Sequence, residues 1–361
     1  MPSTSSSCGT ISEQREPSRV GVQVMGRAPG MVDVAQVAGV SHVTVSRVLN
    51  GHPSVRPETR ARVEAAIAQL GYRRNTVARA LKSKRSSTIG VVMAGSGLYE
   101  LPRVLLGIET TARAAGYEIN LASWQGGAAS DLAEMVRRLT DQSVEGVAVI
   151  AARQVAVDAL SDVVADIPMS VVMSGSVSNP RISFVELDQE LGARLAVRHL
   201  RDLGHERITH LAGNFETFDA AARVQGWRDE LACSPSLPQQ LLEGDFTAES
   251  GYRGAMELAR SSDGLPTAIF AGNDLMALGV LAALAELGLS APDDVSLVGF
   301  DDIAGADHFI PALTTIRQDF MTLGSSAIET LLSTMAGQES VRRQIPPTLV
   351  VRKSTAAPRP H

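Results

Sequence analysis

Valines recur at helical spacing between residues 31 and 50 and predict two short helices that pack against each other. Ala35 is small where two helices must cross closely, and Gly39 can adopt the positive φ that ends a helix sharply. Ser41 is suited to cap the second helix. The pattern therefore predicts a helix-turn-helix, with apolar faces formed by Val34, Val37, Val40, Val45 and Val48.

The second predicted helix presents its other positions outward, and a helix of this size fits the major groove of DNA. We assign His42, Val43 and Arg47 to base edges, with Arg47 suited to a bidentate guanine contact. Positions nearer the phosphates are Ser41, Thr44 and Ser46, and Asn50 completes the candidate set. A helical hairpin that binds nothing would show the same small and apolar residues, so other features must decide.

A third helix is predicted over residues 57–70. Pro57 fits a first helical turn, and Gly71 ends the pattern. The apolar positions spaced i, i+3, i+4 and i+7 are Val63, Ala66, Ile67 and Leu70.

Basic residues concentrate in the first quarter of the chain. Residues 29–87 hold ten Lys and Arg against three Asp and Glu, a net charge of +7, and residues 1–28 add +1. The whole chain carries −6, so residues 88–361 carry −14. A basic segment on an acidic body is typical of a polyanion-binding module. The charge therefore favours DNA binding over a hairpin that binds nothing.

The stretch Asp33-Val34-Ala35 to Val45-Ser46-Arg47-Val48-Leu49-Asn50-Gly51 resembles the start of the lactose/galactose repressor (LacI/GalR) family. The resemblance implies a cytoplasmic homodimer that binds double-stranded, near-palindromic operator DNA. It also implies that a small effector, often a sugar, sets the affinity for DNA. Because no leucine heptad follows Thr334, we expect a dimer without a tetramerising coiled coil.

The same resemblance implies a hinge helix or linker over residues 74–86. In the family this helix orders on DNA against its dimer mate and inserts a leucine into the minor groove, an apolar wedge that unstacks a base step. The matching candidates are Asn75, Arg79 and Leu81. Arg74 departs from the proline common in the family, and a flexible linker is the alternative.

From Thr88 onward, short apolar runs alternate with amphipathic helices, the pattern of parallel strands in βαβ units. We therefore predict two doubly wound parallel sheets in a two-lobed domain like that of periplasmic binding proteins, spanning residues 87–355. Lobe 1 is expected over about 88–187 and 319–346, and lobe 2 over about 188–317 and 347–355. The predicted strands are residues 89–93, 118–121, 146–150, 170–173, 207–212, 240–242, 268–271 and 295–300.

Such sheets bind ligands at the carboxyl ends of their strands, so a cleft between the lobes is the expected site. The planar guanidinium of Arg223 suits hydroxyls or a carboxylate, and Asp301 can accept hydrogen bonds from sugar hydroxyls. Asn273 or Asp274 is also suited to cap a helix. The resemblance implies ligand contacts at Arg223, Phe246, Asn273, Asp301 and Gln318.

The lobe 1 side of the cleft departs from the family. Gly95-Ser96-Gly97-Leu98-Tyr99-Glu100 replaces the usual pattern after the first strand, with Tyr99 as a ligand candidate, and Met173 stands where several relatives have aspartate. These loops decide specificity, so the identity of the effector stays open. Inducer and corepressor are both compatible with the sequence.

Other chemistry is excluded by missing motifs. No complete G-x-G-x-x-G or Walker sequence occurs, so we expect neither an enzyme nor a bound cofactor. Cys8 and Cys233 are the only cysteines, and His199, His205 and His210 are interpreted as structural rather than metal ligands. No apolar run suits a membrane span.

Residues 1–30 are rich in Ser, Gly, Pro and Arg without periodicity and are expected to form a disordered tail. Met25 is an alternative start to Met1. The helix-turn-helix domain is expected over residues 31–73. Two other functions compete with a sugar-responsive repressor: a sugar-binding module without DNA function, and a regulator of the same family that responds to purines or other metabolites.

Overall fold

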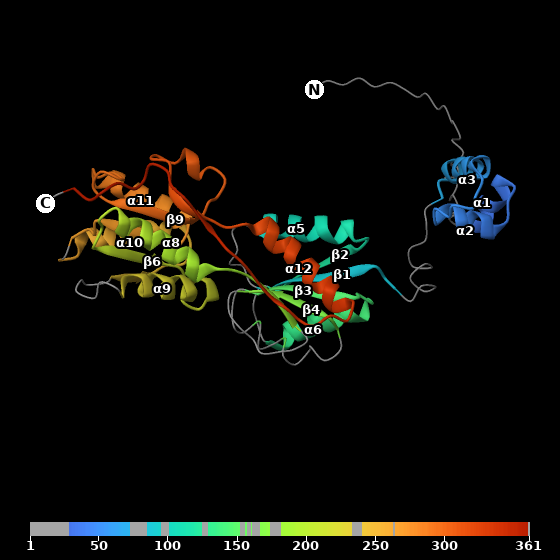
Figure 1. The fold of residues 1–361 in the computed structure, drawn as a ribbon, viewed down its shortest axis with the longest axis horizontal. Helices are drawn as coiled ribbons and strands as arrows, with labels where there is room; N and C mark the ends of the chain where they lie inside the picture. Colours follow the sequence, from blue (N-terminus) through green and yellow to red (C-terminus); the bar gives the residue numbers. More distant parts are fainter. Residues whose placement is uncertain are drawn as a thin grey trace, which may run out of the picture. The chain divides into compact units, whose positions relative to one another are not determined.

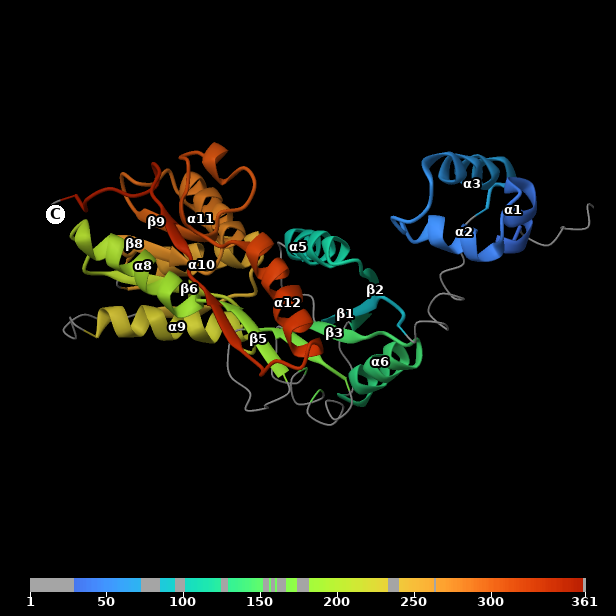
Figure 2. The same cartoon turned by 45° about the vertical axis from the view of Figure 1, so that its right-hand side comes forward.

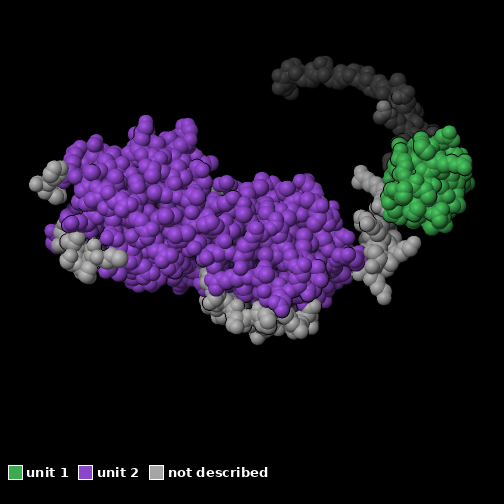
Figure 3. Space-filling model, viewed as in Figure 1, with its two compact units in different colours: residues 1–76 green, residues 77–361 purple. Residues whose placement is uncertain are grey.

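The computed structural model describes residues 29–72, 85–94, 101–124, 129–151, 156, 160, 167–173, 182–232, 240–262 and 264–359. The chain divides into two compact units, residues 1–76 and 77–361 (Figure 3). The predictions for residues 1–28 of the tail, for Asn75, Arg79 and Leu81, for Tyr99 and for both cysteines lie outside the described residues, and Gly30, assigned to the tail, caps the first helix.

In its described residues, 29–72, the first unit contains three helices: α1 (Met31–Ala38), α2 (His42–Leu49) and α3 (Pro57–Leu70) (Figures 1 and 2). We call these three helices the head. Gly39 ends α1 with φ 62°, and Gly71 ends α3 with φ 59°. The Ser41 hydroxyl caps α2 by accepting a hydrogen bond from the Thr44 amide. These features confirm the predicted helix-turn-helix followed by a third helix.

The head has a small core that all three helices share. Its buried residues are Val34, Ala35, Ala38, Val45, Val48, Val63 and Ala66. One prediction was wrong: Val37 is 45% exposed, because the face of α1 that meets α2 and α3 is formed by Val34, Ala35 and Ala38. The helix-turn-helix therefore needs fewer valines in its core than the spacing predicted.

Lobe 1 of the second unit is built on a six-stranded parallel sheet in the order β11-β5-β4-β3-β1-β2. Helices α5 (Leu101–Ala114) and α12 (Phe320–Met335) contribute to a core on one face, and α6 (Ala129–Asp141) to a core on the other. The strands are β1 (Thr88–Ala94), β2 (Glu118–Trp124), β3 (Gly146–Ala151), β4 (Met169–Val172), β5 (Ile182–Leu187) and β11 (Arg342–Ile345).

Lobe 2 repeats this architecture with the strand order β12-β10-β9-β8-β6-β7, in which only β12 is antiparallel to its neighbour. Helices α8 (Gln189–Asp202) and α9 (Phe218–Leu231) contribute to one core, and α10 (Ala248–Arg260) and α11 (Asp274–Glu286) to the other. A 3-10 helix covers Ala306–His308. The strands are β6 (Ile208–Ala212), β7 (Leu241–Glu243), β8 (Ala268–Ala271), β9 (Ser296–Asp301), β10 (Thr314–Arg317) and β12 (Thr348–Val350).

The two sheets confirm the predicted fold class, since parallel strands dominate both and helices cover their faces. The strands β5, β10, β11 and β12 were not among those predicted. Helix α12 and strand β11 return to lobe 1 after β10, and the chain then crosses back to β12 in lobe 2 (Figure 1). This crossing places the last part of the chain against the strand that leads into α12.

Candidate functional site

The outward face of α2 is available to a partner. Ser41, His42, Arg47 and Asn50 are exposed, and Val43 is 56% exposed although it is apolar. Thr44 and Ser46 are partly buried. The structure therefore brings the seven predicted DNA-contacting residues of this segment to one short helix and its two caps.

The turn after α2 is fixed by the third helix. The Arg60 guanidinium donates to the His52 carbonyl oxygen at 3.1 Å and to the Val48 carbonyl oxygen at 3.5 Å. The His52 amide in turn donates to the Arg47 carbonyl oxygen at 2.9 Å. Because these contacts hold the carboxyl end of α2, the position of the Arg47 backbone is set by the packing of the whole head.

A buried polar cluster occupies the ends of several lobe 2 elements, and we call it the Arg223 network. Arg223 lies in the middle of α9 and is only 4% exposed. Its Nε donates to Gln189 Oε1 at 2.8 Å and its Nη1 donates to the Gly272 carbonyl oxygen at 2.5 Å. Its Nη2 lies 3.6 Å from Asp301 Oδ1. A buried guanidinium requires such partners, since an unpaired buried charge is strongly unfavourable.

The carboxylate of Asp301 completes this cluster. Gln318 Nε2 donates to Asp301 Oδ1 at 2.6 Å, and Gln189 Nε2 donates to Gln318 Oε1 at 2.8 Å. Asp301 ends β9, Gln318 follows β10, and Gln189 opens α8. Together with Arg223 of α9, these three elements form a chain of hydrogen bonds that runs from Arg223 through Gln189 and Gln318 to Asp301. The 3.6 Å ion pair between Arg223 and Asp301 closes the cluster at the carboxyl ends of the strands.

Aromatic rings flank the Arg223 guanidinium. Its central carbon lies 3.8 Å from the centroid of the Phe300 ring and 5.7 Å from that of Phe246, which are cation–π distances. Two glycines allow the rings to sit there: a Cβ at Gly192 would meet the Phe300 ring at 2.5 Å, and a Cβ at Gly213 would meet the Phe246 ring at 1.9 Å. Small residues on α8 and after β6 therefore shape this site.

Asn273 and Asp274 begin α11 and hold the neighbouring loops. The Asn273 side chain caps α11 by accepting from the Met276 amide at 2.8 Å and donates to the Phe246 carbonyl oxygen at 3.0 Å. Asp274 accepts from the Ile303 amide at 2.9 Å and from the Thr315 hydroxyl at 2.5 Å. Burial, followed by the nearby Asp301 charge, raises the pKa of Asp274 to about 8.

Sequence reasoning missed two members of the Arg223 network. Gln189 and Phe300 have no distinctive motif, but Phe300 stands near the carboxyl end of the predicted strand 295–300, and Gln189 follows β5, which was not predicted. The position of a polar or aromatic residue at a strand end was the available signal. The structure brings Arg223, Phe246 and Asn273 together with Asp301 and Gln318, whereas Tyr99 lies outside the described residues.

The strand ends of lobe 1 are apolar where lobe 2 is polar. Ala94, Trp124, Ala151 and Met173 are all buried there. Among the described residues, the indole Nε1 of Trp124 is one of the few buried polar atoms without a hydrogen-bond partner. On the residues described, the polar groups of this site therefore come from lobe 2.

Three histidines of lobe 2, His199, His205 and His210, have structural contacts. His210 Nδ1 lies 2.9 Å from the Phe270 carbonyl oxygen, and its ring stacks on Phe270 with centroids 4.3 Å apart. Burial lowers the pKa of His210 to about 3. His199 and His205 reach Thr355 and the Ala356 carbonyl oxygen at 2.9 and 2.8 Å. Within the described ranges, no group of three metal-ligating side chains occurs.

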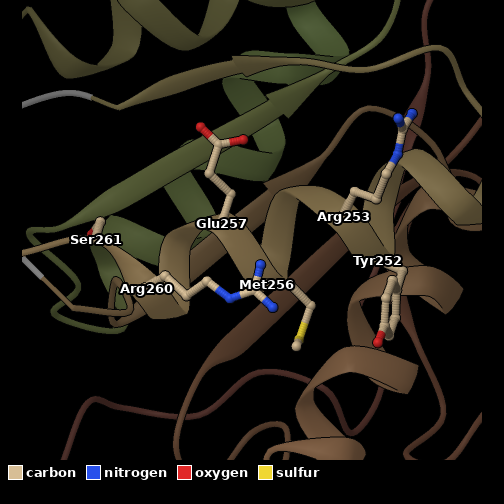
Figure 4. Close-up of a pocket in the computed structure, with 6 residues that line it drawn as sticks. All are labelled: Tyr252, Arg253, Met256, Glu257, Arg260 and Ser261. Atoms are coloured by element: carbon tan, nitrogen blue, oxygen red, sulfur yellow. The ribbon is translucent and has the colours of Figure 1, made fainter.

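A hollow of about 610 Å³ lies on the outer side of α10. Arg253 and Glu257 project from one side of the helix and Tyr252 and Met256 from the other (Figure 4). None of its lining residues belongs to the Arg223 network: Tyr252, Arg253, Met256, Glu257, Arg260 and Ser261. None of the described helices is long and apolar enough to cross a membrane.

A helix-turn-helix with an exposed face on α2 in one unit and a buried polar cluster between parallel strand ends in the other are typical of one class: DNA-binding regulators with a ligand-binding domain. Two family models match these parts. Residues 30–75 match the model for bacterial regulatory proteins of the lacI family, and residues 197–355 match a periplasmic binding protein-like domain.

Full-length relatives extend this similarity along the chain. The lactose operon repressor of Escherichia coli (strain K12) is 36% identical over 329 residues, 91% of each chain. The HTH-type transcriptional repressor PurR of Vibrio vulnificus (strain CMCP6) is 34% identical over 325 residues, 89% of this chain and 96% of the relative. The chain therefore belongs to the lacI family of bacterial regulatory proteins and is a DNA-binding transcriptional repressor.

Solved structures agree with this assignment. The lac repressor dimer bound to operator and the anti-inducer ONPF superposes with a TM-score of 0.81 at 33% identity, covering 92% of this chain and all of the other. The complex of the regulator CelR with cellobiose gives a TM-score of 0.67 at 30% identity, covering 90% of this chain and 99% of the other. The predicted family and fold are thereby confirmed.

Proposed function

We propose that this protein is a homodimeric repressor whose affinity for operator DNA is set by a sugar bound at the Arg223 network. The observation that carries the proposal is the combination of a buried guanidinium, a carboxylate and two amides beside the rings of Phe246 and Phe300. Bidentate donors and acceptors suit neighbouring hydroxyls, and aromatic faces suit the C–H surface of a sugar ring.

Within the protein, hydrogen bonds already link Arg223 through Gln189 and Gln318 to Asp301. A sugar that enters must therefore replace these hydrogen bonds with bonds to its own hydroxyl groups. An apolar ligand could not replace them and would leave buried polar atoms unpaired. This requirement favours a polyhydroxylated effector. Asn273 contributes through the loop of Phe246, whose backbone carbonyl it holds.

The head supplies the DNA-binding half of the proposal. His42, Val43 and Arg47 are proposed to reach base edges, while Ser41, Thr44 and Ser46 lie nearer the phosphates. Two heads in a dimer would read the two halves of a near-palindromic operator. The structure of the lac repressor dimer on operator supports this arrangement by similarity.

The test is fluorescence anisotropy at fixed salt, using the DNA upstream of the protein's own gene as the labelled probe. Lactose, cellobiose, hypoxanthine and guanine are added separately. We expect tight binding that depends on the palindrome and that one sugar changes. A response to hypoxanthine or guanine only would replace the sugar with a purine, a possibility raised by similarity to proteins named PurR. Absence of specific DNA binding would contradict the assignment of the α2 face.

A further inference from the structure

Two consecutive non-glycine residues at the end of β9 have positive φ angles. Asp301 has φ 106° and Asp302 has φ 53°. L-residues rarely adopt this region, and asparagine and aspartate tolerate it better than most. Such strained conformations persist only where surrounding contacts hold them, and they concentrate at functional sites. The carboxylate of Asp301 faces Arg223 and Gln318, so the strain lies within the proposed sugar site.

Asp302 does not join the Arg223 network and instead pairs with two arginines. Its Oδ2 accepts from Arg317 Nε at 2.6 Å and its Oδ1 accepts from Arg352 Nη2 at 2.6 Å. The Asp302 side chain is 9% exposed, whereas the side chains of Arg317 and Arg352 are 56% and 16% exposed. The pair with Arg352 is thus the more shielded one, and it is expected to contribute more.

Arg352 is itself fixed at three points. Besides Asp302, its Nη1 donates to the Leu313 carbonyl oxygen at 2.7 Å, and its backbone amide donates to Thr314 Oγ1 at 2.9 Å. Arg352 follows β12 in the segment that crosses from lobe 1 back to lobe 2. The last part of the chain is therefore bound directly to the turn that carries Asp301.

The other side of the turn is held by Asp274, which accepts from the Ile303 amide. Thr315 of β10 binds the same Asp274 carboxyl group. The three residues 301–303 are consequently tied to α11, to β10 and to the C-terminal segment. The contacts of Asp302 involve two full positive charges, which also offset its repulsion of the adjacent Asp301 carboxylate.

We propose that Asp302, held by Arg352 and Arg317, is a positioning residue that keeps the Asp301 carboxylate aimed at the effector. The C-terminal segment containing Arg352 is then part of the effector site although it does not touch the effector. The role of Asp302 in effector binding rests on the proposed function of the Arg223 network. Its role in holding the turn rests on the ion pairs alone.

The geometric part is tested without any effector, by hydrogen–deuterium exchange of the full-length protein followed in peptides covering residues 300–305. We expect Arg352→Gln and Asp302→Asn to accelerate exchange there by tenfold or more, and Arg317→Gln by less. Arg343→Gln is the matched control, since it removes a lobe 1 arginine from its ion pair with Glu329. Unchanged exchange in both Arg352→Gln and Asp302→Asn would overturn the proposal.

The functional part is tested by calorimetric titration with cellobiose and with lactose. Where wild type binds either sugar, Arg352→Gln and Asp302→Asn should weaken its binding by about tenfold, and Arg352→Lys should restore part of the loss. The decisive variant is Asp301→Asn: if Asp302 acts through Asp301, adding Asp302→Asn to it should change the affinity by less than twofold. A full, additive loss in the double variant would overturn the positioning role.

Failure of the proposed sugar function has a different signature. If neither sugar binds wild type while the exchange of residues 300–305 still responds to Arg352→Gln, the ion pairs hold the turn and the choice of effector is wrong. If a sugar binds wild type and the Arg352 and Asp302 variants equally well, the effector site stands and the positioning role is wrong.

Discussion

The recognition face of the head and the Arg223 network of lobe 2 are built in opposite ways. The candidate DNA contacts come from one helix of eight residues and its caps, and most of them are exposed. The candidate effector contacts that the structure describes come from α8, α9, β9, the loop after β7, the start of α11 and the residue after β10, and all except the partly buried Phe246 are almost completely buried. A surface that meets a large polyanion can be local, whereas a site that encloses a small molecule needs several chain segments.

This difference predicts that a packing defect in lobe 2 destroys one site and spares the other. A Cβ at Gly226 would lie 2.3 Å from the Glu190 carbonyl oxygen, where α9 crosses α8. We expect Gly226→Val to lower the free energy of unfolding of the second unit by about 3 kcal/mol. Calorimetry should show the transition of the second unit at a lower temperature and that of the head unchanged.

Gln225→Val is the matched control, because it adds the same side chain to the neighbouring, exposed position of α9. Equal shifts for Gly226→Val and Gln225→Val would show that close approach of α8 and α9 does not limit stability. A shift of the head transition would show that the two regions are not independent.

On the head, removal of a single exposed side chain should affect function without affecting the fold. Arg47→Ala is expected to cost about 1 to 3 kcal/mol of operator binding and to relax specificity at one base pair. Anisotropy titrations with operators changed at each position measure both effects. Lys353→Ala, which removes a basic residue outside the head, serves as the control. Equal losses of operator affinity in the two variants would mean that Arg47 contributes only its charge and no specific base contact.

Buried titratable groups in lobe 2 predict a pH dependence that the exposed face of the head should lack. The pKa of Asp274 is raised to about 8, so folding favours its protonated form and this contribution to stability is lost as pH rises toward 8. The pKa of His210 is lowered to about 3, so its contribution is lost as pH falls below its usual value of 6.5.

Between about pH 4 and 6.5, the effects of Asp274 and His210 on the free energy of unfolding have opposite signs. Above that range only the effect of Asp274 remains. The free energy of unfolding of the second unit should therefore decrease by about 1 kcal/mol between pH 6.5 and 8. Urea titrations at several pH values should show this slope in wild type and in the exposed control Asp141→Asn. If the decrease with pH persists in Asp274→Asn, titratable groups other than Asp274 cause it.

The smallest expected effect concerns the cap of the recognition helix. Ser41→Ala removes the acceptor of the Thr44 amide and should destabilise α2 by about 1 kcal/mol, whereas Ser41→Gly should have a smaller effect. Hydrogen exchange of residues 42–49 in the full-length protein measures this difference. Identical exchange in the alanine variant and wild type would mean that tertiary packing alone holds the helix.

The sequence was most informative where neighbouring residues determine the structure. Pro57 and Gly71 mark the ends of α3, and Ser41 marks the start of α2, because caps and turn residues act within one helical turn. Val37 shows the limit of this reasoning. Its spacing suits a core position, but only the packing of three helices decides which side of α1 is covered.

In lobe 2 the individual residues were predicted and their connections were not. Arg223 and Asp301 are 78 positions apart in the chain, and nothing local indicates that Gln189 would bind both Arg223 and Gln318. The same holds for Asp302, whose two arginine partners come from β10 and the C-terminal segment. Long-range pairs of this kind arise from strand order, which a hydrophobic pattern does not encode.

The sequence by itself determined the helix-turn-helix, the alternation of strands and helices, the basic head and the residue types available at strand ends. These properties depend on side-chain periodicity, capping and charge, which are read within short windows. Only the tertiary structure decided that Asp301 is strained, that burial raises the pKa of Asp274 and that Arg352 pairs with Asp302 beside the site. Each of these depends on burial and on partners brought together by the two sheets, because desolvation and ion pairing are properties of the folded surroundings.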